Sequence, residues 1–75
     1  MFKKLRFGEC DHEGDLEAFE WEVVNSGGHV TEKRWNCHQR TGIIEIIVAN
    51  EQEYERFLDR FKARDSYHFL LNKRS

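Results

Sequence analysis

The strongest pattern in the chain joins a buried strand to an amphipathic helix in the second half of the sequence. β-branched residues form a nearly unbroken run over 43–48, which is typical of a central strand covered by other elements. Asn50 follows as a helix N-cap, and Glu53 lies three residues later, where a capping box has its acid. An apolar stripe at i, i+3, i+4 and i+7 then predicts a helix over 51–63; its members are Tyr54, Phe57, Leu58 and Phe61.

Alternation of apolar and polar positions predicts two further strands at the ends of the chain. The first spans 2–7 and places Leu5 and Phe7 on one face. The last spans 67–71. Because one helix separates it from the central strand, we expect it to run parallel to that strand through a right-handed crossover.

The segment that follows an acidic loop at 8–15 predicts a β-meander. Strands are expected at 16–24 and 30–38, joined by a turn at 25–28 whose two glycines tolerate positive φ. A loop at 39–42 then leads into the central strand and sets Trp35 opposite Ile46. In this register one sheet face is apolar and is expected to be covered by the helix; its members are Phe19, Trp21, Val23, Trp35, Cys37, Ile44, Ile46 and Val48.

These elements predict one small α+β domain over residues 1–75. It has a mixed, mainly antiparallel sheet of four to five strands, with one amphipathic helix packed on one face. A chain of 75 residues supports only one core and is marginally stable at this size. Six Phe, two Tyr and two Trp residues help to fill a thin core, and dimerisation would add stability.

The composition favours a globular protein in a reducing compartment. Hydrophobic residues make up 39% of the chain and charged residues 35%, which is too apolar for a disordered segment. Two cysteines are too few for a disulfide framework. No apolar stretch resembles a signal peptide or is long enough to span a membrane. We therefore expect a cytoplasmic protein that does not bind membranes.

Four thiol and imidazole side chains suit zinc by residue type but not by spacing. The sequence contains no Cys-x-x-Cys pair, and neighbouring residues of a strand point to opposite faces of the sheet. We therefore expect no bound metal, and a small zinc-binding domain is an alternative. The four candidate ligands are Cys10, His12, Cys37 and His38.

Calcium binding and catalysis are also disfavoured. Asp11, Glu13 and Asp15 alternate as calcium ligands do, but neither the later bidentate glutamate nor the flanking helices are predicted. Cys10 and His12 are close enough in sequence to form a nucleophile and base, but no other catalytic motif accompanies them. We expect no cofactor and no enzymatic activity.

Charge is segregated along the chain, although the net charge is only −2. Seven acids and no Lys or Arg occur between residues 9 and 22. On the predicted register, the sheet face away from the helix carries a second group of charges, which are Glu20, Glu22, Glu32, Arg34 and Glu45. Ile43 and Ile47 flank Glu45 on this face, which is unusual for a surface in open water and suits an interface.

These features predict a small non-catalytic module that binds another protein and acts as a regulatory or inhibitory factor. Small proteins of bacteria and their phages often have this size and role. The partner is expected to have a basic surface, a homodimer is possible, and the acidic segment disfavours nucleic acid, although a nucleic-acid-binding domain is a second alternative. The predicted partner-binding residues are Glu9, Asp11, Glu13, Asp15, Glu20, Glu22, Ile43, Glu45 and Ile47.

Overall fold

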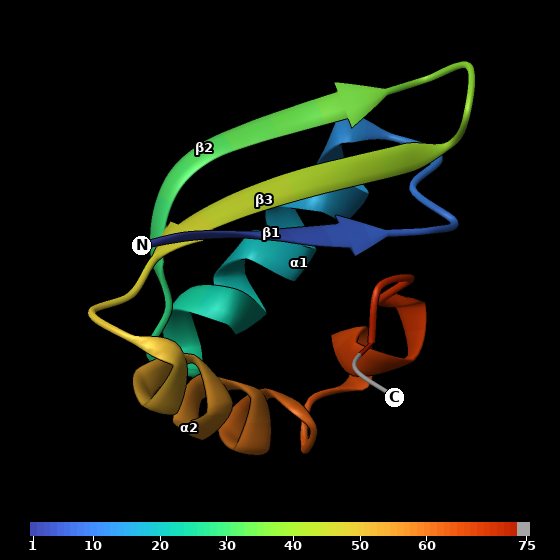
Figure 1. Cartoon of the computed structure of the whole chain (residues 1–75). Coiled ribbons are helices and arrows are strands. Elements are labelled where there is room, and N and C mark those ends of the chain that lie inside the picture. Colours follow the sequence, from blue (N-terminus) through green and yellow to red (C-terminus); the bar gives the residue numbers. More distant parts are fainter. Residues whose placement is uncertain (74–75) are drawn as a thin grey trace.

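The computed structural model describes residues 1–73 and has an α+β fold (Figure 1). In chain order its elements are β1 (Phe2–Phe7), α1 (Glu13–Asn25), β2 (His29–Asn36), β3 (Thr41–Ile47), α2 (Glu51–Phe61) and the 3₁₀ helix η1 (Asp65–Phe69). The described strands form one antiparallel sheet in the order β1-β3-β2. The β-branched run is therefore the middle strand, as predicted, but the expectation of four to five strands in a mixed sheet is wrong.

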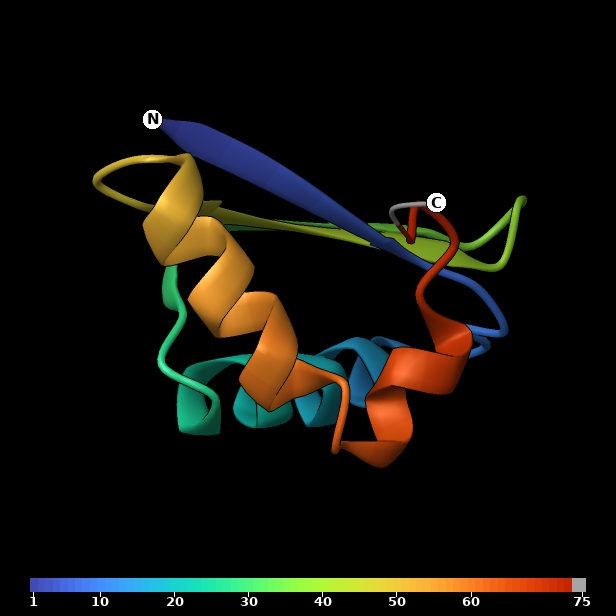
Figure 2. The ribbon, with the colours of Figure 1, turned by 60° about the horizontal axis from the view of Figure 1, so that its bottom comes forward.

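The fold has two layers. The sheet forms one layer, and α1, α2 and η1 lie together on one side of it (Figure 2). Leu5 and Phe7 of β1 and Ile44 and Ile46 of β3 are fully buried beneath the helices. Phe7 stacks on Phe19 of α1 with ring centroids 4.7 Å apart. The helical side of the core consists of Leu16, Phe19, Val23, Tyr54, Phe57, Leu58 and Phe61.

The segment predicted as a strand at 16–24 is instead the helix α1. Leu16, Phe19 and Val23 are its buried residues, and they lie at i, i+3 and i+7 of a helical stripe. The same spacing places Phe19 and Val23 on alternate positions with Trp21, which produced the misleading strand pattern. Asp15 favours the helix, because its carboxylate accepts hydrogen bonds from the backbone N–H groups that precede the first turn.

The glycines at 27–28 end this helix rather than turn a hairpin. Gly27 has a φ of 95°, and its N–H donates to the carbonyl of Val24 at 3.0 Å. The N–H of Gly28 donates to the carbonyl of Val23, also at 3.0 Å. This pair of bonds is a Schellman motif, in which a glycine in the left-handed region satisfies the last carbonyls of a helix.

Over residues 32–36 of β2, the register of the β2–β3 hairpin differs from the prediction by four positions along β3, and a bulge between Val30 and Glu32 shifts it by one more position before that. Trp35 lies opposite Gly42 rather than Ile46, because the connecting turn spans 37–40 and not 39–42. Cys37 is therefore an exposed turn residue and not part of the core. An even shift preserves the two faces of a strand, so Ile43, Glu45 and Ile47 still point away from the helices.

The last predicted strand is also absent as such. Residues 65–69 form η1, and Leu70 then makes one antiparallel bridge to Phe7 of β1. The Asn72 side chain continues this contact, since it accepts from the N–H of Arg6 and donates to the carbonyl of Lys4. The C-terminal segment thus covers the outer edge of β1. No helix among residues 1–73 has the length and apolarity needed to cross a membrane.

Candidate protein-interaction surfaces

The face of the sheet that the helices do not cover, here called the open sheet face, carries apolar and charged side chains in cross-strand rows. Phe2 of β1 lies opposite Ile47 of β3, and these side chains are 61% and 41% exposed. The next row joins Lys4, Glu45 and Glu32, and a third joins Arg6, Ile43 and Arg34. The open sheet face therefore consists of Phe2, Lys4, Arg6, His29, Glu32, Arg34, Asn36, Thr41, Ile43, Glu45 and Ile47.

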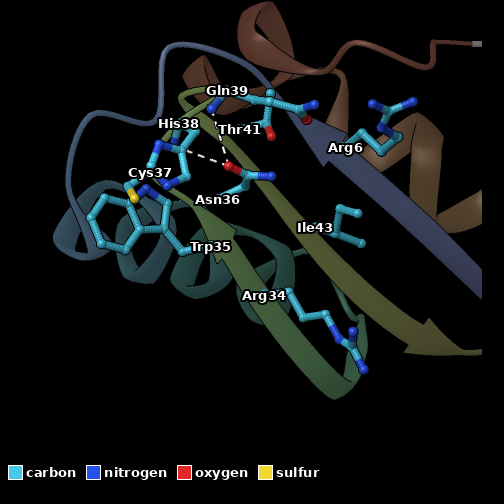
Figure 3. A pocket seen from close by; sticks show the side chains of 9 residues that line it. All are labelled: Arg6, Arg34, Trp35, Asn36, Cys37, His38, Gln39, Thr41 and Ile43. Carbon is cyan, nitrogen blue, oxygen red and sulfur yellow. Dashed lines mark hydrogen bonds between the residues drawn. The ribbon is translucent and has the colours of Figure 1, made fainter.

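A depression of about 430 Å³ lies at the hairpin end of this face. Figure 3 shows Arg6 on one side of Ile43 and Arg34 on the other, with polar side chains of the hairpin at the far end. Arg34 forms an ion pair with Glu32 at 2.6 Å, and the hydrogen bond between them raises the pKa of the Arg34 guanidinium. The Lys4 and Arg6 side chains form no hydrogen bond or ion pair with another described residue.

The structure separates the predicted acidic residues from the sheet. Glu13, Glu20 and Glu22 belong to α1, on the helical side of the molecule, so Glu20 and Glu22 do not lie on the open sheet face. Glu9 and Asp11 lie in the loop that precedes α1. The nine predicted partner-binding residues thus do not share one surface. Ile43, Glu45 and Ile47 lie on the open sheet face, whereas the acids belong to α1, which packs on the other side of the sheet (Figure 2), or to the loop before it.

Several of the acids have structural partners. Asp15 accepts from the N–H groups of Asp11 and His12 and so begins α1. Asp11 forms an ion pair with Arg40, and this hydrogen bond lowers the pKa of the Asp11 carboxyl. Glu22 accepts from both the N–H and the hydroxyl of Ser66. Some carboxylates of the acidic segment therefore cap α1 or bind other parts of the fold, and the segment is not a uniform outward patch.

The outward side of α1 retains an exposed negative field. Glu20 bonds to Lys33 of β2 at 2.8 Å, and this hydrogen bond, assisted by the charges of Glu20, Glu17 and Glu13, raises the pKa of the Lys33 ammonium. Glu13 and Glu17 are exposed, and α1 contains no basic residue. Trp21, which the sequence pattern assigned to the core, lies on this side and is 66% exposed.

The thiol and imidazole side chains do not assemble into a reactive or metal-binding group. Cys10 is fully buried, and burial, assisted by Asp15 and Asp11, raises the pKa of its thiol. Its Sγ donates to the backbone carbonyl of His12 at 3.8 Å rather than to an imidazole. Within residues 1–73, no three His, Cys, Asp or Glu side chains are grouped so that they could hold a metal ion.

Comparisons of the chain with family models, with curated proteins and with solved structures find no match.

Sequence reasoning missed four exposed residues of these surfaces. The alternation of Phe2, Lys4 and Arg6 with the buried Leu5 and Phe7 was a sufficient signal for the first three, because residues i and i+2 of a strand share a face. The exposure of Trp21 was missed because the segment was assigned the two-residue period of a strand, whereas the helical period places Trp21 opposite the core.

Proposed function

We propose that the chain is a small non-catalytic module that binds another protein through the open sheet face and has a regulatory or inhibitory role. One observation carries this proposal: the uncovered face combines exposed apolar side chains with the unpaired Lys4 and Arg6. Arginine and aromatic residues are enriched at protein interfaces. A face that contacts only water would gain nothing from the exposed apolar side chains of Phe2 and Ile47.

Nucleic acid fits this face less well. Glu32 and Glu45 lie in the same row as Lys4, next to the row of Arg6 and Arg34, and phosphate groups would be repelled by both carboxylates. A protein segment can meet both signs of charge. The buried, weakly acidic thiol of Cys10 supports a non-catalytic role, because a thiol is a poor nucleophile until it is deprotonated.

Affinity capture with matched variants tests the proposal. Ile47→Glu adds a charge beside the exposed Phe2 on the open sheet face, and Ala63→Glu adds the same charge to an exposed site that follows α2. We expect a protein that is captured from lysate by the parent and by Ala63→Glu but is lost from Ile47→Glu. Equal capture by all three proteins, or capture of nucleic acid instead, would contradict the proposal.

A further inference from the structure

Trp21 projects from the side of α1 that faces away from the core. The inner side of the helix is fixed by Leu16, Phe19 and Val23, all of which are buried. Trp21 lies two positions from Phe19 and from Val23, which turns it about 160° away from each at roughly 100° per residue. Tryptophan is highly buried on average, so a side chain that is 66% exposed at mid-helix needs an explanation.

The neighbours of Trp21 extend it into an apolar strip along the helix. Ala18 and Val24 lie at i−3 and i+3, on the same side of α1, and Val24 is 52% exposed. None of the ring pairs among the described residues includes Trp21. We call Ala18, Trp21 and Val24 the α1 outer strip. It lies opposite the buried side of α1, a helix that packs on one side of the sheet (Figure 2).

The charged residues that α1 itself places around the strip are all acidic, and the cation Lys33 of β2 pairs with one of them, Glu20. Glu17 lies at i−4 from Trp21 and forms no hydrogen bond or ion pair with another described residue. Glu13 lies one further turn toward the start of the helix and is also exposed. An apolar strip with a carboxylate margin complements a surface that carries both apolar and cationic side chains.

We infer that the α1 outer strip is a docking site for a basic amphipathic segment of a partner protein, with Trp21 as its anchor. The inference rests on the proposed protein-binding function but uses the opposite side of the molecule. Trp21 supplies a large area to desolvate, which is the usual property of an interface hot spot. Lysine or arginine side chains of the partner pair with Glu17 and Glu13, and one can lie over the indole face.

Other occupants fit less well. An anionic membrane surface and a nucleic acid are both repelled by the carboxylates of α1. The open sheet face of a second copy carries Lys4, Arg6 and Arg34, but it also carries Glu32 and Glu45, so its net positive charge is small. A cationic, amphipathic protein segment is the occupant that complements both the apolar strip and the carboxylates of Glu17 and Glu13 beside it.

A defined peptide tests this inference without knowledge of the natural partner. The probe is a labelled helical peptide of about 14 residues, made of leucine and lysine with the leucines at i, i+3, i+4 and i+7. Its control has glutamate in place of every lysine. Fluorescence anisotropy of the label reports binding by the intact protein, and the Kd is expected to rise steeply between about 50 and 300 mM salt as the charges are screened.

Two pairs of variants locate the bound peptide. Trp21→Ala is expected to weaken binding by at least about tenfold, whereas Phe2→Ala, an equally exposed aromatic on the open sheet face, changes it by less than about twofold. Glu17→Gln is expected to weaken binding more than Asp59→Asn, which removes one exposed carboxylate from α2. Since all four side chains are exposed, thermal melting is expected to show that the variants remain folded.

A spectroscopic measurement gives an independent readout. In a Trp35→Phe background the only indole is Trp21, whose emission is expected to shift to the blue when the peptide buries it. Equal binding by Trp21→Ala and the parent, equal loss in Phe2→Ala, or equal binding of the glutamate peptide would overturn the inference. A blue shift with anionic lipid vesicles but not with the lysine peptide would overturn it as well.

Failure of this inference and failure of the proposed function are distinguishable. The peptide experiment depends on Trp21 and Glu17, and the capture experiment depends on Ile47. Loss of one result leaves the other standing, because the two surfaces lie on opposite sides of the molecule (Figure 2).

Discussion

The hydroxyl groups of the two buried serines differ in whether they have a hydrogen-bond partner. Ser26 is 2% exposed, and its Oγ has no hydrogen-bond partner. Ser66 is also buried, but its hydroxyl donates to the Glu22 carboxylate. A buried polar group without a partner costs free energy, while a satisfied one contributes to stability. The same substitution is therefore expected to have opposite effects at the two sites.

Ser26→Ala is expected to raise the free energy of unfolding by up to about 1 kcal/mol, because it removes an unsatisfied hydroxyl. Ser66→Ala is expected to lower it by about 1–2 kcal/mol, because it breaks a bond to a charged acceptor. Urea denaturation measures both. If Ser26→Ala loses as much stability as Ser66→Ala, the hydroxyl of Ser26 has a partner in solution.

The two cysteines are expected to react with maleimide at very different rates. Cys10 is fully buried, and its burial raises the pKa of the thiol, so the folded protein contains little of its thiolate. Cys37 is exposed in the hairpin turn. Mass spectrometry after short exposure at neutral pH should show one label, located on Cys37 by peptide mapping. A fast second label on Cys10 would show that the loop at 8–12 opens readily.

At the residue scale, the sequence predicted correctly those core positions that are buried whether the segment is a strand or a helix. Phe19 and Val23 were assigned to the core correctly, because i and i+4 coincide in a strand and in a helix. Trp21 was assigned wrongly, because i+2 is on the same face only in a strand. Which residues of this segment are buried depends on whether it is a strand or a helix, and the local sequence pattern did not distinguish the two.

At the scale of elements, α2 and the segment that follows it supply the cations that α1 lacks at its C-terminal end. The Nε of Arg60 donates to the carbonyl of Ser26 at 2.7 Å, and Arg64 reaches the carbonyl of Asn25 at 3.4 Å. The last turn of α1 has no basic residue of its own. The guanidinium groups thus satisfy carbonyls at the end of α1 and complement the negative end of the helix dipole.

Arg60→Met is expected to lower the free energy of unfolding by about 1–2 kcal/mol, because the cap bond is lost while the side-chain length is kept. Arg56→Met is the matched control, since Arg56 is exposed on the same helix and forms no bond to another described residue. It is expected to change stability by less than about 0.5 kcal/mol. Equal losses in the two variants would show that Arg60 contributes only through its charge.

Elements with a long local signal were predicted well, and elements defined by tertiary context were not. The helix expected at 51–63 is α2, and the strand expected at 2–7 is β1, because an N-cap, a stripe or an alternation specified each locally. The segment 67–71 alternates as a strand does, yet it pairs with β1 through only one bridge. Its conformation is set by the contact of η1 with α1 through Ser66 and Glu22, which no local pattern encodes.

At the scale of the whole molecule, a single small core carries the stability. Phe57 is 1% exposed and stacks between Tyr54 and Phe61, with ring centroids 6.3 and 5.5 Å away. Phe57→Ala is expected to cost about 3–5 kcal/mol. Against a total of about 5–10 kcal/mol for so small a domain, this change largely unfolds it. Circular dichroism on heating measures the loss, and a melting temperature within a few degrees of the parent would contradict the packing of α2.

Phe2→Ala is the control for that experiment, because it removes the same atoms from an exposed site. It is expected to cost less than about 1 kcal/mol. The same variant serves as the sheet-face control in peptide binding, so its folded state is checked in both experiments.

Self-association is the last consequence of the two-layer fold, and it concerns the open sheet face. Ile43 and Ile47 lie on this face, and Phe2 adjoins Ile47 across the strands. A small domain gains stability when it covers such a face, and two copies related by a two-fold axis would cover it symmetrically. A stable interface of this kind buries about 800 Å² per partner, so the charged rows would have to be included.

We therefore expect sedimentation velocity to show a dimer at micromolar concentrations. Ile47→Glu is expected to convert it to a folded monomer, because it places a carboxylate within the apolar row. Val24→Glu puts the same charge on an exposed aliphatic residue of α1 and should leave the dimer intact. A parent protein that remains monomeric at high micromolar concentration would exclude this dimer. Because the dimer and the proposed partner use the same open sheet face, the partner is expected to compete with self-association.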